Sequence, residues 1–92
     1  MNWKRIKKMQ DEYGYTQLQE LISNGTAWQM EGSVGRTAMS ALQSGACMLP
    51  KKVYYDAYGN KIPSRDMLKK GSTGTYQNTV KFYSEITDYT AI

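Results

Sequence analysis

The chain has 92 residues, one cysteine and no histidine, and its formal net charge is +4. A chain of this length is expected to form one domain over residues 1–92, with little room for a deep internal active site. Without histidine, the usual general base and the commonest metal ligand are missing, and one cysteine builds neither a zinc site nor a disulfide framework. We therefore expect a non-enzymatic protein without catalytic residues, metal or cofactor.

The N-terminal part of the chain predicts helices. Residues 2–13 place apolar side chains at helical spacing, and Gly14 follows as a stop. A second helix is expected over residues 17–23, with Thr16 as its N-cap and Asn24-Gly25 at its end.

A third helix is expected from Thr26 to about residue 44. Gly32 and Gly35 lie inside this range, and each costs roughly 1 kcal/mol relative to alanine in a helix interior. Either the helix breaks near residues 31–33 and restarts with Ser33 as its cap, or the glycines let another element pack closely. The sequence favours the break.

Several side chains of this half are candidates for the core. Trp3 and Trp28 lie at helix starts on apolar stripes, where a tryptophan usually anchors a core. Cys47 lies in an apolar run and is expected to be a buried, unreactive small hydrophobe. The stripe of the third helix consists of Val34, Ala38, Ala41 and Leu42, with Met39 beside them.

The C-terminal half has a different pattern. Val53-Tyr54-Tyr55 favours a strand, residues 58–61 a tight turn, and Lys61-Ile62 a short return strand that Pro63 limits to an edge. Residues 69–75 predict a loop, and residues 76–86 fit either a helix or a strand, of which we choose the helix. The expected fold is a small α+β domain, mostly helical, with three N-terminal helices, a short β-hairpin-like segment and a C-terminal helix.

No apolar run approaches the ~20 residues that span a membrane. The basic residues at the N-terminus are not followed by the apolar core of a signal peptide. We expect a cytoplasmic protein with no membrane partner.

The positive charge is unevenly distributed. Residues 51–81 carry seven basic and two acidic side chains, which favours an anionic partner. Basic groups among exposed aromatic rings can follow a nucleic-acid backbone, or dock an acidic protein surface with tyrosines as anchors. A solvated surface over a small core is the plain alternative. The candidate contact residues here are Lys51, Lys52, Tyr54, Tyr55, Tyr58, Lys61, Arg65, Lys69 and Lys70.

Two glycine-containing segments are candidate anion sites. Residues 32–36 have a G-x-x-G spacing before Arg36 that resembles the nucleic-acid loop of KH domains, so Arg36 joins the candidate contact residues. However, Glu31 would repel phosphate or pair with Arg36, and no strand precedes the loop, so a glycine break between packed helices is favoured. Residues 69–75 lack the residue order of a P-loop, and a linker with a helix cap is favoured there.

Three stretches resemble small uncharacterised accessory proteins of tailed phages and prophages: MEGSVGRTAM at 30–39, MLP at 48–50 and YGNKIPSR at 58–65. The similarity spans about residues 28–83. The resemblance implies an accessory protein that binds and blocks a host factor or defence complex, as anti-CRISPR proteins do. It carries over no catalytic residues.

Three functions are compatible with these patterns. The leading hypothesis is a protein-binding module, an inhibitor of a host protein or of a host protein–nucleic-acid complex. The first alternative is a small basic protein that binds nucleic acid directly, and the second is a self-associating structural or assembly subunit. The sequence leaves the oligomeric state open.

Overall fold

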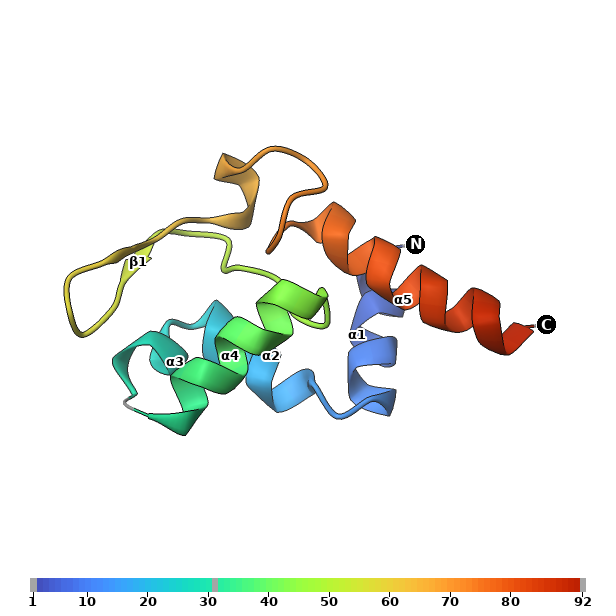
Figure 1. Cartoon of the computed structure of the whole chain (residues 1–92), viewed down its shortest axis with the longest axis horizontal. Helices are drawn as coiled ribbons and strands as arrows, with labels where there is room; N and C mark the ends of the chain where they lie inside the picture. Colours follow the sequence, from blue (N-terminus) through green and yellow to red (C-terminus); the bar gives the residue numbers. More distant parts are fainter. Residues whose placement is uncertain (1, 31, 92) are drawn as a thin grey trace.

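A computed structural model describes residues 2–30 and 32–91, and the side chains of residues 2–30 and 32–86. Four helices come first, followed by a hairpin, a 3-10 turn and a long C-terminal helix (Figure 1). The bounds are Trp3–Glu12 for α1, Thr16–Ser23 for α2, Thr26–Gln29 for α3, Ser33–Ser44 for α4, Tyr54–Tyr55 for β1, Lys61–Ile62 for β2, Arg65–Met67 for η1 and Tyr76–Ala91 for α5. This confirms the expected α+β class and the helical choice for residues 76–86.

The helix starts differ in detail from the sequence predictions. Thr16 is the first residue of α2 rather than its N-cap, because its hydroxyl donates to Asp11 Oδ1 at 3.2 Å instead of accepting from the first turn. At α3 the predicted start at Thr26 holds, and Asn24 Oδ1 accepts the Thr26 N–H at 2.9 Å.

The predicted break in the third helix is confirmed. Helix α3 ends at Gln29 and α4 begins at Ser33, so Ser33 is helical and Gly32 takes the cap position. The φ angle of Gly32 is 78°, a left-handed value that glycine adopts without the steric cost of a side chain. A predicted pairing of Glu31 with Arg36 lies outside the described residues.

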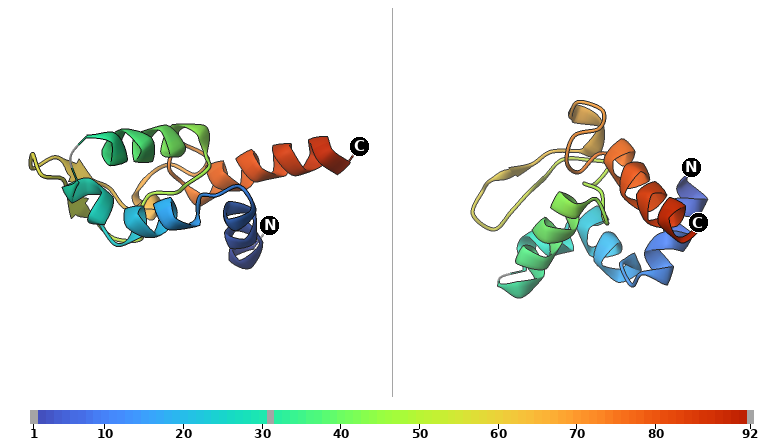
Figure 2. Two further views of the ribbon diagram at one scale, coloured as in Figure 1. Left: turned by 90° about the horizontal axis from the view of Figure 1, so that it is seen from below. Right: turned by 45° about the vertical axis from the view of Figure 1, so that its right-hand side comes forward.

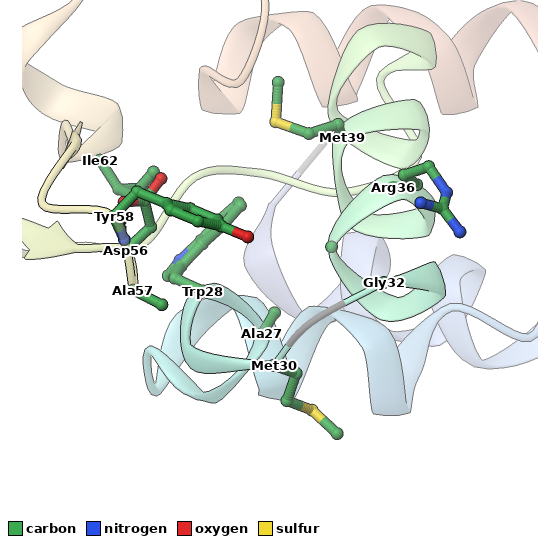
Figure 3. Close-up of a pocket in the computed structure, with 11 residues that line it drawn as sticks. Ala27, Trp28, Met30, Gly32, Arg36, Met39, Asp56, Ala57, Tyr58 and Ile62 are labelled. Carbon is green, nitrogen blue, oxygen red and sulfur yellow. Dashed lines mark hydrogen bonds between the residues drawn. The ribbon is translucent and has the colours of Figure 1, made fainter.

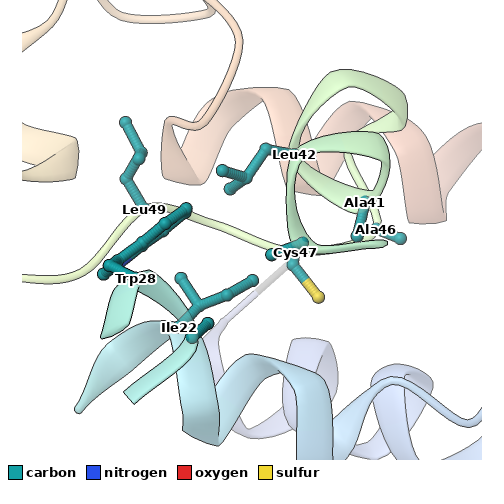
Figure 4. Packing of buried hydrophobic residues seen from close by; sticks show 9 residues of the cluster. Ile22, Trp28, Ala41, Leu42, Ala46, Cys47 and Leu49 are labelled. Carbon is teal, nitrogen blue, oxygen red and sulfur yellow. The ribbon is translucent and has the colours of Figure 1, made fainter. Parts of the chain in front are cut away.

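The larger core cluster lies between α2, α3, α4 and the segment that follows α4 (Figure 4). Trp28, Leu42 and Cys47 are buried there, as predicted. Met39 lies at the edge of this cluster, where it lines a cavity together with Trp28 and Leu42, and it is 48% exposed. Trp3 departs from its predicted core role: it is 41% exposed, and its ring lies 5.7 Å from the Arg65 guanidinium.

The segment from Ala46 to Pro50, which we call the central segment, is buried throughout and contributes residues to both hydrophobic core clusters. Side chains from the helices, rather than a neighbouring strand, satisfy much of its backbone. Gln19 accepts the Met48 N–H at 2.8 Å and donates to the Met48 carbonyl at 3.0 Å. The Ala46 carbonyl accepts from Gln10 Nε2 at 3.0 Å and from the Tyr83 hydroxyl at 2.7 Å.

The hairpin and α5 lie at opposite ends of the longest axis, which measures 45 Å (Figures 1 and 2). Helix α5 packs against α1 at its start and extends past the other helices (Figure 2). Within residues 2–30 and 32–91, no helix has the length and hydropathy needed to cross a membrane.

Candidate partner-binding surface

The hairpin is fixed to the helical body by contacts with α2 and α3. The Ala57 N–H donates to the Trp28 carbonyl at 3.2 Å, and Gln29 Nε2 donates to the Tyr55 carbonyl at 2.7 Å. The Tyr54 hydroxyl donates to the Ser23 carbonyl at 3.3 Å. These bonds join the hairpin to two successive helices and so position its outward side chains.

The register of the hairpin separates its residues onto two faces. Tyr54 pairs with Ile62 and Tyr55 pairs with Lys61 in an antiparallel ladder. Directly paired residues share a face, and successive residues alternate between faces. Tyr54 and Ile62 pack against the core cluster, whereas Tyr55 and Lys61 are exposed.

The turn of the hairpin exposes a further tyrosine. Asp56 Oδ1 accepts the N–H groups of Tyr58 at 2.9 Å and of Asn60 at 2.8 Å, which closes the turn. The backbone hydrogen bond from Asn60 is the main reason that the pKa of Asp56 is lowered from its usual value. Tyr58 is 83% exposed at this turn, and Tyr55 is 58% exposed behind it. We call Tyr55, Tyr58 and Lys61 the outer hairpin surface.

The remaining predicted contact residues lie outside this surface. Lys51 and Lys52 are exposed just before β1, and the Lys52 Nζ lies 5.8 Å from the centre of the Tyr54 ring. Lys69 and Lys70 are exposed in the loop between η1 and α5. Arg36 is exposed on the first turns of α4.

Two predicted contact residues, Arg65 and Tyr54, are not part of an exposed surface. Arg65 is buried, and its Nε donates to the Leu49 carbonyl at 2.7 Å, which satisfies an acceptor of the central segment. Burial lowers the pKa of the Arg65 guanidinium. Tyr54 is half-buried over Gly25 and bonded to α2. Both side chains therefore hold the fold.

Cys47 and the loop 69–75 have the structural roles that the sequence predicted. Cys47 has no exposed surface, and burial raises the pKa of its thiol to about 12, so the unreactive thiol is the dominant form at neutral pH. In the loop 69–75, Thr75 accepts the Asn78 N–H at 3.3 Å and thus caps α5, as the linker interpretation predicted. Among the described residues, no three His, Cys, Asp or Glu side chains are close enough to hold a metal ion.

The sequence did not indicate an apolar hollow beside the hairpin, of about 260 Å³ (Figure 3). It lies between α3, α4 and the hairpin turn, and Trp28, Met30, Met39 and Tyr58 are among its lining residues. These residues share no periodicity, because the break at Gly32 sets the direction of α4 relative to α3. The one sequence feature of this hollow is that two of its lining residues are methionines. In the structure Met30 is 44% exposed and Met39 is 48% exposed.

Comparison with known proteins adds no relative. The chain matches no protein-family model, no characterised protein and no solved structure.

Proposed function

We propose that this chain is a non-enzymatic protein-binding module that holds an acidic partner against its outer hairpin surface. The observation that carries the proposal is the exposure of Tyr55 and Tyr58 beside Lys61 on a hairpin that is itself bonded to α2 and α3. Exposed tyrosines on a fixed support offer large contact area at low entropic cost, and they are enriched among residues that dominate binding energy.

Charge supports an acidic partner. Lys51 and Lys52 adjoin β1, Lys61 lies on β2, and the segment 51–81 holds most of the excess positive charge. Such a distribution speeds association with an acidic surface and disfavours basic ones. The resemblance of residues 28–83 to phage accessory proteins makes bacterial proteins, defence complexes included, the first partners to search.

The test is affinity capture from a bacterial lysate treated with nuclease, using the wild-type protein and two variants of equal net charge. The variant Lys51→Glu/Lys61→Glu changes the hairpin region, and Lys4→Glu/Lys8→Glu changes exposed lysines of α1. We expect a defined protein to be retained by the wild type and by the α1 variant, but lost from the hairpin variant. Equal retention by both variants would contradict the proposed surface.

A second candidate function is direct binding of nucleic acid through the same surface. The observation that favours it is the exposed ring of Tyr58 at the hairpin turn, since stacking on an aromatic ring contributes about 1–3 kcal/mol per base. This alternative predicts that the captured material disappears with nuclease and that affinity falls steeply as salt rises. Retention of protein after nuclease, with a weak dependence on salt, would reject it.

A further inference from the structure

A groove runs beside the hairpin, formed by two adjoining cavities. The first is the hollow of Figure 3, and the second has a similar volume of about 260 Å³. Trp28, Met39 and Ile62 line both cavities, so the two adjoin along these side chains. Each is smaller than the roughly 300–1,000 Å³ that typically encloses a drug-sized ligand, so each has the size of a site for a side chain.

The second cavity is the more apolar of the two ends. Leu42, Leu49 and Pro63 complete its walls together with the three shared residues. Met39 forms part of the rim and is about half exposed, and its flexible thioether can adapt to a side chain of irregular shape. An apolar residue placed in this cavity would bury surface that the protein now exposes.

The charge beside the groove is positive at this same end. Among the described residues that line the second cavity, Lys61 is the one charged side chain. At the first cavity, the Asp56 carboxylate is already used by the N–H groups of the turn, and Figure 3 shows the Arg36 guanidinium turned away from Trp28. A carboxylate next to the apolar anchor would therefore find its counter-charge at Lys61.

We infer that the groove binds a linear peptide segment of the partner, with one large apolar side chain in the second cavity and an adjacent carboxylate at Lys61. This inference rests on the proposed protein-binding function and names the form in which the partner is recognised. Of the outer hairpin surface, Tyr58 and Lys61 also line the groove, and Tyr55 then contacts residues that flank the segment.

The experiment is a selection of short random peptides displayed on yeast, carried out with the wild-type protein and with Met39→Glu. Met39 is exposed on α4, so its replacement leaves the core intact. The most enriched peptide is then synthesised with a fluorescent label, and its affinity is measured by polarisation for Met39→Glu, Lys61→Glu and, as controls, Tyr55→Ala and Lys8→Glu.

We expect the wild type to enrich peptides with a large apolar residue next to Asp or Glu. Met39→Glu should weaken the selected peptide by about tenfold or more, and Lys61→Glu by about threefold or more through loss of the counter-charge. The controls should stay within about twofold of wild type, as expected for positions outside the contact. If the wild type enriches no peptide, or only peptides that bind Met39→Glu equally well, the groove assignment is wrong.

The same variants separate this inference from the proposed function. If Met39→Glu still captures the protein partner while Lys51→Glu/Lys61→Glu does not, the binding function stands and the groove is not used. If neither variant affects a captured protein, both proposals fail.

Discussion

The central segment 46–50 and the hairpin are both short non-helical stretches, but they differ in what their side chains and backbone groups contact. In the central segment, side chains of Gln10, Gln19 and Tyr83 bond the backbone, and nothing faces solvent. In the hairpin, one face is held against the core while Tyr55 and Lys61 on the other face make no such structural contact in the described residues. The comparison separates residues that hold the fold from residues that are available for a partner.

The largest effect is expected from removal of the Gln19 side-chain amide, which bonds the backbone of Met48. Gln19→Leu leaves the Met48 N–H and carbonyl buried without partners, each costing about 1–3 kcal/mol, so the free energy of unfolding should fall by about 2–6 kcal/mol. Urea unfolding followed by circular dichroism measures the change. Gln17→Leu, at an exposed position of the same helix, is the matched control and should change it by less than about 0.5 kcal/mol. Equal effects of the two substitutions would show that the amide does not hold the segment.

Alkaline pH should lower the free energy of unfolding because the thiol of Cys47 is buried in the central segment. The pKa of its thiol rises from the ordinary 9.0 to about 12 in the folded protein, so the thiol stays protonated while the unfolded chain releases its proton. Below pH 9 the full stability is present, and it is lost as pH rises from about 9 towards about 12, by about 1.4 kcal/mol per unit.

Between about pH 8 and about pH 10.5, the free energy of unfolding should therefore fall by about 2 kcal/mol more in the wild type than in Cys47→Ala. The two proteins share every other side chain, so the comparison isolates the contribution of the thiol. Identical losses in the two proteins would show that the buried thiol is not the cause.

A smaller effect is expected where the hairpin rests on α2. Gly14 and Gly25 have φ angles of 83° and 84°, so alanine carries a similar backbone cost at both positions. A Cβ at Gly25 would lie 2.5 Å from the Tyr54 ring, whereas at Gly14 it would meet nothing within 4 Å. Gly25→Ala should therefore lower the free energy of unfolding by about 1–3 kcal/mol more than Gly14→Ala, measured in urea. Equal effects would mean that Tyr54 is not packed against this glycine.

Much of the fold follows from local sequence. Helix stripes, the stop at Gly14 and the break at Gly32 predict α1 to α4, and the Gly59 turn predicts the hairpin. What the sequence did not predict depends on contacts between distant residues. The reciprocal bonds of Gln19 to Met48 join positions in different elements, and no periodicity marks them.

The candidate site was predicted only in part, because it too depends on contacts between distant residues. Composition identified the basic and aromatic segment. The alternation of side chains along a strand would have been enough to place Tyr54 and Tyr55 on opposite faces of the hairpin. The burial of Arg65 could not be read from its neighbours, because it depends on the Leu49 carbonyl needing a donor. The groove depends on how α3 and α4 are oriented across the break.

The measurement that tests the central claim most directly is the affinity of the captured partner for two double variants of similar surface change. Tyr55→Ala/Lys61→Glu alters the outer hairpin surface, and Met67→Ala/Lys8→Glu alters an equally exposed apolar residue and an exposed lysine elsewhere. Both should keep the stability of the wild type to within about 0.5 kcal/mol. We predict a loss of affinity of about tenfold or more for the hairpin variant alone. Wild-type affinity in the hairpin variant would contradict the assignment of this surface to the partner.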